Sequence, residues 1–162
     1  MAFTLSSSAV EPGGRIPDQY TTSGQNVSPP LAWSDVPPDT KSFALIMEDL
    51  DATGGAYVHW VVFNVPGGSG GLPEALPRGT QLPDGAIQGR SGSGGNGYEG
   101  PSLSPGVLAH NYRMTLYALD TTLDLDATAT AQGLLQAMQG HILAESQLQF
   151  QWWNRRAQLA CD

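Results

Sequence analysis

The sequence predicts a mainly β domain with one substantial helix near the C-terminus. Apolar runs rich in β-branched and aromatic residues, at 43–51 and 57–66, are typical of strands. Twenty Gly and twelve Pro are scattered among apolar segments, which favours a fold with many turns. The length of 162 residues suits one core, so we predict a single domain over residues 1–162.

The first half of the chain predicts strands joined by short turns. "NVSPPLAWSDV" (26–36) mixes Pro with apolar residues and precedes a turn, which indicates strand, turn, strand. "FALIMEDLD" (43–51) is apolar at odd and even positions alike for five residues and then becomes polar. This pattern is typical of a strand that is buried on both faces and reaches solvent at its end. "YVHWVVFNVP" (57–66) predicts the next strand, and the short "ATGG" between the two predicts a hairpin.

The second half predicts a long loop, a strand, a helix and a last strand. Residues 67–106 are dominated by Gly, Pro and Ser, and loops of this length are usually functional or disordered. "ATATAQGLLQAMQGHILAESQ" (127–147) predicts the helix, with Asp126 or Thr128 as its N-cap, and "LQFQWW" (148–153) predicts the last strand. "HNYRMTLYALD" (110–120) is the strand between them, with its two faces formed by His110, Tyr112, Met114 and Leu116 and by Tyr117 and Leu119.

Charge and cysteine content exclude several classes of protein. A net charge of −8 and a pI near 4.6 argue against binding nucleic acid or an anionic membrane by bulk electrostatics, so any anion must be held locally. Cys161 is the only cysteine, so no internal disulfide forms. Met1–Val10 lacks signal-peptide features, and no apolar run reaches the roughly 18 residues of a membrane span. We therefore predict a cytoplasmic protein that is not integral to a membrane.

Two acids and two histidines lie at the ends of predicted strands. Asp49 and Asp51 point to the same side, and the hairpin brings His59 near them. His110 opens a strand directly after the Gly-rich loop. A purely structural interpretation is that the acids form Asx turns at a strand end. The convergence of all four side chains favours a common site.

Three kinds of chemistry fit these residues. They could bind a divalent metal, although their spacing matches no common zinc pattern. They could act as general acid and base, with Ser91, Ser93 and Ser102 nearby but no obvious base for any of them. They could also form an anion site, in which a carboxylate orients an imidazole and backbone N–H groups of the Gly-rich loop form a nest. The residue pattern leaves all three open.

Several motifs resemble one known family in the same order along roughly residues 24 to 150. They are "NVSPPLAWSDVP", "EDLDATGG", "HWVVFNVP", "LPDGAIQGRSG", "GYEGP", "HNYRMTLYALD" and "GHILAESQL". Together they resemble the phosphatidylethanolamine-binding protein family, most closely its short bacterial, Raf kinase inhibitor-like branch. The agreement of several motifs in order is more specific than any one of them.

The resemblance implies a fold, a pocket and a function. It implies a large antiparallel sheet packed on a smaller sheet, with one helix near the C-terminus. It also implies a small surface pocket for phosphate, acetate or a phosphoethanolamine headgroup, with no catalytic residue, metal or cofactor, and a role as modulator or inhibitor of a kinase or protease. The pocket residues that the resemblance assigns here are Asp49, Asp51, His59, Gly100, Ser102, His110 and Tyr112.

The chain departs from the family pattern at three places. Leu50 replaces a proline between the two acids, and Asn111 replaces an arginine. Residues 102–104, "SLS", stand where bacterial relatives have Cys-Pro-Pro, so we expect a more mobile and more polar pocket rim. Loss of the arginine removes a positive charge, and we expect weaker ligand binding.

The first hypothesis is therefore a non-catalytic binding module, in which a carboxylate keeps His59 or His110 charged as a donor to an anion. The alternatives are a hydrolase or lyase that uses His110 with Asp51, and a metal-binding protein. Binding to imidazolium strengthens as pH falls toward about 6, whereas metal binding weakens. The tail, "WWNRRAQLACD", either packs as a final strand with a frayed end, covers the pocket edge, or forms a homodimer contact.

Overall fold

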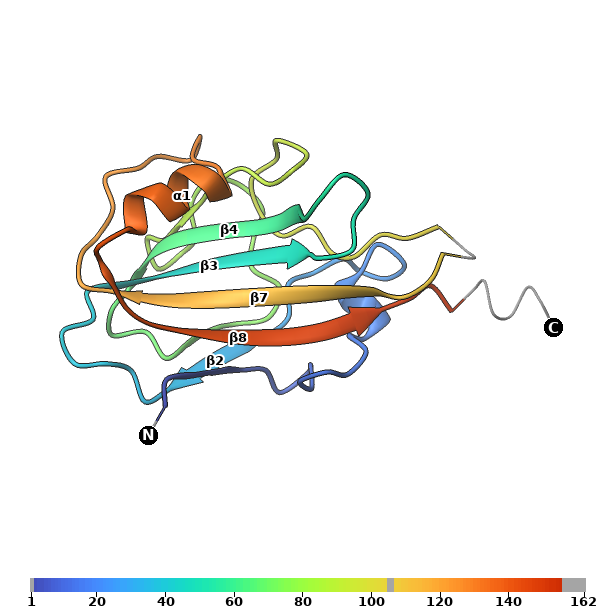
Figure 1. Cartoon of the computed structure of the whole chain (residues 1–162), viewed down its shortest axis with the longest axis horizontal. Coiled ribbons are helices and arrows are strands. Elements are labelled where there is room, and N and C mark those ends of the chain that lie inside the picture. Colours follow the sequence, from blue (N-terminus) through green and yellow to red (C-terminus); the bar gives the residue numbers. More distant parts are fainter. Residues whose placement is uncertain (1, 105–106, 156–162) are drawn as a thin grey trace.

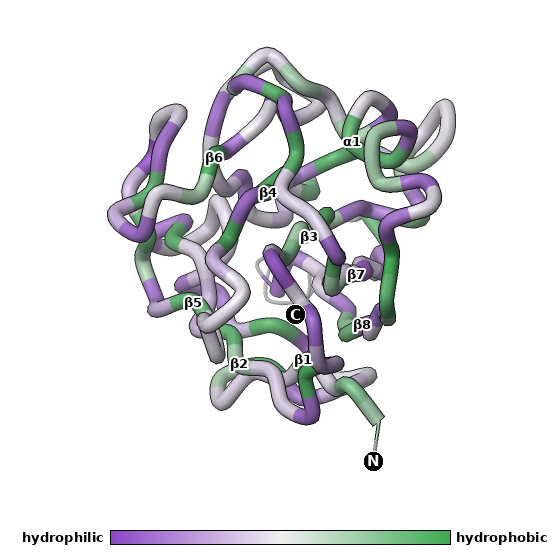
Figure 2. The backbone as a smooth tube through the Cα atoms, turned by 90° about the vertical axis from the view of Figure 1, so that its left-hand side faces the viewer, coloured by the Kyte–Doolittle hydropathy of each residue, from purple (hydrophilic) through white to green (hydrophobic). Residues whose placement is uncertain are grey.

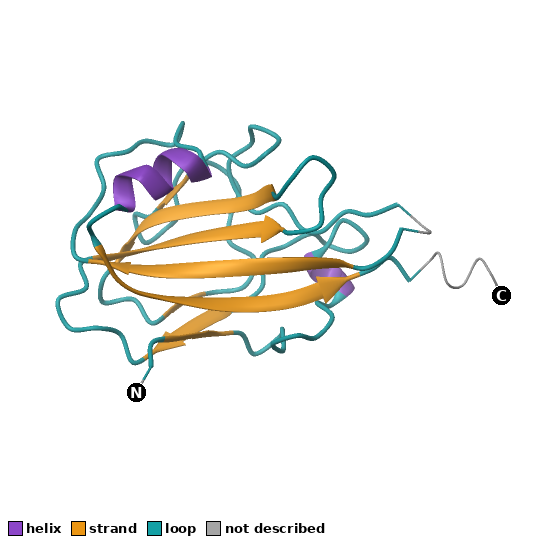
Figure 3. Ribbon diagram, viewed as in Figure 1, coloured by secondary structure: helices purple, strands orange, loops and turns teal. Residues whose placement is uncertain are grey.

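Two antiparallel sheets and one α-helix make up the fold of the computed structural model, which describes residues 2–104 and 107–155 (Figures 1 and 3). The small sheet has the order β1-β2-β5, with bounds Thr4–Ser6, Leu31–Ser34 and Gly71–Leu72. The large sheet has the order β6-β4-β3-β7-β8, with bounds Ile87–Gln88, Tyr57–Pro66, Ser42–Asp49, His110–Leu119 and Ile142–Trp152. A 3-10 turn, Asp18–Tyr20, and helix α1, Ala131–Met138, complete the described elements. The predicted fold class is confirmed.

The central strand β3 is buried on both faces, as its unbroken apolar run predicts. Phe43, Leu45 and Met47 join a core shared with apolar residues of the small sheet. Ala44 and Ile46 point to the opposite face and pack in a second core that includes apolar residues of α1. The view along the strands in Figure 2 shows this layering, with β1 and β2 on one side of the large sheet and α1 on the other. Each large apolar side chain buried in this way contributes about 2 kcal/mol.

The pairing of β3 gathers three strand ends at one edge of the large sheet. β3 pairs antiparallel with both β4 and β7, so its last residue, Asp49, lies opposite Tyr57 at the start of β4 and opposite Tyr112 near the start of β7. The predicted hairpin and the two predicted faces of β7 are confirmed. This register brings residues that are far apart in sequence to one place.

The predicted helix over 127–147 is wrong in its extent. Helix α1 begins after Thr130, whose Oγ1 accepts a hydrogen bond from the Gly133 N–H at 3.2 Å. Asp126 instead accepts from the Thr128 N–H in a turn before the helix. Gly140, with φ of 83°, follows the helix in the left-handed region that favours glycine. The chain then turns back into β8.

Strand β8 is longer than the predicted strand at 148–153. The sequence predicts a helix for its first part, from Ile142, because Leu, Ala and Glu also suit helices, but this part pairs with the last part of β7. Its end is packed, since Trp152 is fully buried and the Arg15 guanidinium lies over the Trp152 and Trp153 rings. The tail 152–162, whose Trp and Arg pairs are predicted to cover the pocket edge or form a dimer contact, is described only as far as residue 155, and residues 156–162 lie outside the described residues.

One buried amide holds part of the long Gly- and Pro-rich segment against β4. Gln88 has no exposed surface, and its Nε2 donates to the carbonyl oxygens of Pro77 and Gly79 at 3.0 and 2.8 Å. Its Oε1 accepts from the Trp60 indole N–H at 2.8 Å. A buried amide with all these partners stabilises one conformation of the loop, because leaving any of them unpaired is costly. No helix in the described part of the chain is long and apolar enough to span a membrane.

Candidate functional site

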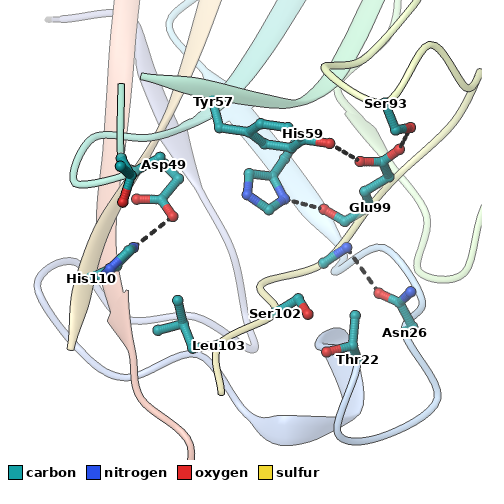
Figure 4. Close-up of a pocket in the computed structure, with 13 residues that line it drawn as sticks. Thr22, Asn26, Asp49, Tyr57, His59, Ser93, Glu99, Ser102, Leu103 and His110 are labelled. Atoms are coloured by element: carbon teal, nitrogen blue, oxygen red, sulfur yellow. Dashed lines mark hydrogen bonds and ion pairs between the residues drawn. The ribbon is translucent and has the colours of Figure 1, made fainter. Parts of the chain in front are cut away.

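A hollow of about 510 Å³ lies where β3 ends and β4 and β7 begin. Three loops complete its wall: residues 22–26, residues 52–53 of the hairpin between β3 and β4, and the Gly-rich segment 93–103. Figure 4 shows labelled side chains from the first and the last of these. Five of the seven predicted pocket residues line it, namely Asp49, His59, Gly100, Ser102 and His110. The structure thus brings together residues from both halves of the chain.

Asp49 holds the ring of His110. The Asp49 side chain is 7% exposed, and its Oδ2 lies 2.7 Å from His110 Nδ1. Its other oxygen, Oδ1, accepts a hydrogen bond from the Asp51 N–H at 2.9 Å, which is the Asx turn of the structural interpretation. The Asp49 carboxylate therefore both forms the Asx turn and holds the His110 ring. Because a carboxylate accepts, His110 Nδ1 carries a proton, and Nε2 is the nitrogen that this ring can offer to a ligand.

His59 is held by backbone instead of a carboxylate. Its Nδ1 donates to the Glu99 carbonyl oxygen at 2.7 Å, and the Glu99 N–H donates back to the His59 carbonyl oxygen at 3.1 Å. Figure 4 shows the ring between Asp49 and Glu99. Burial lowers the pKa of His59, although the Glu99 carbonyl and the charges of Asp49 and Glu99 oppose this shift. This differs from the expectation that a neighbouring carboxylate keeps the ring charged.

Three hydroxyl groups donate hydrogen bonds to the Glu99 carboxylate. Tyr57 donates to it at 3.1 Å, Ser91 donates to it at 2.7 Å, and Ser93 also donates to it. Burial and this contact with Glu99 raise the pKa of Tyr57. Ser91 and Ser93 are candidate nucleophiles in the hydrolase alternative, but their hydroxyl groups donate to the Glu99 carboxylate.

Gly100 is required for close packing. A Cβ at this position would lie 2.2 Å from the Tyr20 carbonyl oxygen and 2.5 Å from Asn26 Oδ1. The Gly100 N–H donates to that same Asn26 oxygen at 2.8 Å, and the Glu99 N–H is bonded to His59. These amides are used within the protein, so the predicted backbone nest for an anion is not supported at this pair of residues.

Asp51 and Tyr112 do not line the hollow. Asp51 Oδ2 accepts from the Asn111 N–H and Nδ2 at 2.7 and 2.9 Å, and these hydrogen bonds lower the pKa of Asp51. Asn111, which departs from the arginine that the family resemblance implies, thus binds Asp51. Tyr112 is fully buried, with its ring 5.6 Å from His59 and 6.5 Å from His110, and its hydroxyl group has no hydrogen-bond partner. Burial first, and then the charges of Asp49 and Asp51, raise the pKa of Tyr112.

Sequence reasoning missed several residues that line the hollow. They come from separate parts of the chain, and no local motif marks them: Thr22, Asn26, Ala52, Thr53, Tyr57, Glu99 and Leu103. Ser93, named only for the hydrolase alternative, also lines the hollow. Among the described lining residues there is no Lys or Arg, whereas Asp49 and Glu99 supply two carboxylates. Within residues 2–104 and 107–155, no group of three or more His, Cys, Asp or Glu side chains is arranged to hold a metal ion.

Comparison with known proteins identifies the family. The profile of the family described as "Phosphatidylethanolamine-binding protein" matches residues 6–153. The chain is 49% identical over 146 residues to a protein of Methanothermobacter thermautotrophicus named "UPF0098 protein", covering 90% of this chain and 95% of that one. The chain belongs to the phosphatidylethanolamine-binding protein family, as the motifs predicted.

Solved structures agree with this assignment. A phosphatidylethanolamine-binding protein homologue from Chlamydia trachomatis superimposes with a TM-score of 0.86 at 35% identity, over 94% of this chain and 98% of that one. YbcL of E. coli gives a TM-score of 0.87 at 31% identity, over 95% and 99%. A relative from Mycobacterium tuberculosis, 39% identical over 85% of this chain and 68% of its own length, is named "Putative lipoprotein LppC". The predicted cytoplasmic location therefore stays a prediction.

Proposed function

We propose that this protein is a non-catalytic binding module whose pocket holds a small ligand bearing a phosphate or carboxylate group, such as phosphate, acetate or a phosphoethanolamine headgroup. One observation carries the proposal: two imidazoles from different strands line one hollow, and each has its Nδ1 already bound, to Glu99 and to Asp49. Each ring is therefore fixed in position, with Nε2 left as its ligand-binding atom.

Hydroxyl and amide groups around the hollow support the same ligand class. Asn26 and Ser102 line it and offer donors to a ligand oxygen, whereas the Thr22 hydroxyl already donates to the Pro101 carbonyl oxygen at 3.2 Å. A hydrogen bond to a charged group contributes about 1.5 to 3 kcal/mol, so a few of them give millimolar to micromolar affinity after the cost of association.

The hydrolase or lyase alternative has less support. Asp51 is bound to Asn111 and does not line the hollow, so it is not placed to act with His110. In the part of the chain that the structure describes, no serine hydroxyl is hydrogen-bonded to a histidine ring, and Ser91 and Ser93 donate to Glu99. By family resemblance alone, we extend the proposal to modulation of a kinase or protease partner by the bound ligand.

Calorimetric titration of the metal-stripped protein tests the proposal. O-phosphoethanolamine, inorganic phosphate, acetate and Zn²⁺ are titrated at about pH 5.5 and 7.5. We expect anion binding that is stronger at the lower pH and at least about tenfold weaker in His110→Ala. His141→Ala is the matched control, since His141 also pairs with an aspartate but does not line the hollow. Zn²⁺ binding that strengthens with pH, without anion binding, would overturn the proposal and favour metal-assisted hydrolysis.

A further inference from the structure

We propose that the pocket takes up a monoanion together with one proton, and that this proton resides on Nε2 of His59 in the complex. The inference rests on the proposed function and specifies the charge class of its ligand. It follows from the charges that line the hollow and from the way in which each imidazole is anchored.

The hollow has an unusual charge balance for an anion site. Its described lining contains the carboxylates of Asp49 and Glu99 and no Lys or Arg. The guanidinium of Arg78 donates to the Asn26 carbonyl oxygen at 3.3 Å but is not part of the lining. An anion that enters without a proton would therefore meet two negative charges and no lining cation. Positive charge has to come from an imidazole.

His59 is the imidazole whose charge depends most directly on the ligand. Its Nδ1 donates to an uncharged carbonyl oxygen, so a protonated ring has no carboxylate in direct contact. By contrast, the charge of a protonated His110 is offset by Asp49, whose oxygen lies 2.7 Å from Nδ1. A bound anion therefore becomes the counter-ion of His59, whereas His110 already has one.

The groups that face His59 come from every element around it. Asp49 ends β3, Tyr57 begins β4, and Glu99 lies in the Gly-rich loop. The rings of Tyr57 and Tyr112 lie edge-on to the imidazole at 5.0 and 5.6 Å, and His110 of β7 lines the same hollow. The two carboxylates favour the charged ring, but burial is the larger effect and lowers the pKa of His59.

Two consequences follow for the free and bound states. Near neutral pH the free ring is neutral, and the lone pair on Nε2 repels a ligand oxygen. When an anion arrives, a proton from solvent binds Nε2, and Nε2–H donates to the ligand. One proton balances one negative charge, so a monoanion enters with no net change. A dianion would leave one negative charge unbalanced beside Asp49 and Glu99.

Calorimetry with ligands of fixed charge tests the proton uptake. Acetate and dimethyl phosphate remain monoanions between about pH 6.5 and 8.5, so every proton taken up binds the protein. Titration in buffers with different ionisation enthalpies is expected to show uptake of close to one proton per ligand, with Kd rising about tenfold per pH unit above pH 7. Sulfate, a permanent dianion, is expected to bind at least about tenfold more weakly.

Imidazole NMR on the unmodified protein identifies the residue that takes up the proton. The sequence contains three histidines, so their titrations can be assigned separately. Saturating acetate is expected to raise the midpoint of the His59 titration by more than about two pH units and to leave that of His141, which lies outside the pocket, unchanged. This measurement needs no substitution and so does not depend on the folding of a variant.

Two glutamine variants complete the test, because glutamine keeps an N–H donor but does not titrate. His59→Gln is expected to bind acetate with no proton uptake, whereas His110→Gln, at lower affinity, retains the uptake. Binding without uptake in the unmodified protein, or uptake that is lost in His110→Gln and kept in His59→Gln, would overturn the inference alone. Absence of anion binding at any pH would overturn the proposed function as well.

Discussion

Strand β7 has a histidine–aspartate pair near each of its ends, and the two pairs differ in their surroundings. At the pocket end, His110 Nδ1 lies 2.7 Å from Asp49, and the two side chains are 18% and 7% exposed. At the helix end, His141 Nδ1 lies 2.8 Å from Asp120, which directly follows β7, and the side chains are 46% and 43% exposed. The contact itself is nearly the same in both pairs.

The comparison shows that the pair alone does not define a site. An exposed pair of this kind contributes only about 0 to 1 kcal/mol, since water and salt screen it. The buried pair differs because Asp49 also accepts from the Asp51 N–H, and because a second imidazole, His59, lines the same hollow. The pocket end differs in that its pair is more buried and lies beside a second imidazole. Four predictions test this difference.

The largest expected effect comes from a glycine at the pocket end. Gly100→Ala places a Cβ 2.2 Å from the Tyr20 carbonyl oxygen, and we expect it to destabilise the protein by about 3 kcal/mol. Gly140→Ala, at the helix end, meets no atom within 4 Å, so only its φ of 83° is strained, at a cost of about 1 kcal/mol.

Urea denaturation of both variants measures this difference. Gly68→Ala is the control, because its Cβ also meets no atom within 4 Å and no left-handed φ is involved; we expect a change below about 0.5 kcal/mol. Equal losses for Gly100→Ala and Gly140→Ala would mean that the pocket end is not the more tightly packed of the two.

The second prediction compares the two aspartates directly. Asp49→Ala removes two hydrogen bonds of a buried carboxylate, and we expect a loss of about 2 kcal/mol in the free energy of unfolding at pH 7. Asp120→Ala is expected to cost about 0.5 kcal/mol because its pair is exposed. Chemical denaturation of the two variants and of Asp49→Asn, which keeps the shape without the charge, checks this. An Asp120→Ala loss as large as that of Asp49→Ala would contradict the comparison.

The third prediction concerns pH and the buried ring of His59. Its pKa in the folded protein lies below the ordinary value of 6.5, so the unfolded chain binds more protons as pH falls through this range. The stability that neutral His59 provides is present above about pH 6.5 and declines as pH falls toward the lowered pKa. Denaturation at about pH 7.5 and 5.5 is expected to show a smaller pH-dependent loss in His59→Gln than in the unmodified protein.

Acidic groups with lowered pKa values do not interfere in this range. The pKa values of Asp18, Asp51 and Asp126 all lie below their ordinary value of 3.8. The stability that these carboxylates contribute therefore declines only at lower pH. An identical pH dependence in His59→Gln and the unmodified protein would show that burial of this ring is not coupled to protonation.

The smallest expected effect comes from Leu50, at the position where the family resemblance implies a proline. The Leu50 N–H donates to the Asn111 carbonyl oxygen at 2.8 Å, and Leu50→Pro removes this bond at a cost of about 1 kcal/mol. Proline offsets this by restricting the unfolded chain, by about 0.4 to 1 kcal/mol, so we expect a net change within about 0.5 kcal/mol. Thermal unfolding measures it, and a loss above about 2 kcal/mol would show that this bond is essential to the pocket end.

The sequence predicts the strands better than the helix. The bounds predicted for β4, 57–66, are confirmed, because β-branched and aromatic residues end at a proline. The helix was extended through Gly140 because the residues after it also suit helices, and their pairing with β7 is a tertiary effect that composition does not contain. The short strands β1, β5 and β6 lack a pattern long enough to detect.

The site was predictable where polar residues interrupt apolar strands. Asp49, His59 and His110 stand out because each occupies the end of an otherwise apolar strand. Glu99 and Asn26 were missed because they act through contacts with residues 40 and 74 positions away, which no local spacing reveals. The family resemblance added Gly100 and Ser102, which line the hollow.

Glu99 connects the His59 ring in β4 with the serines of the Gly-rich loop. Its carbonyl group fixes one imidazole, and its carboxylate is held by the hydroxyl groups of Tyr57, Ser91 and Ser93. A change of serine in the Gly-rich loop therefore reaches His59 through a single residue, without altering either histidine. The orientation of this imidazole is therefore set jointly by a strand and by a loop residue 40 positions further along the chain.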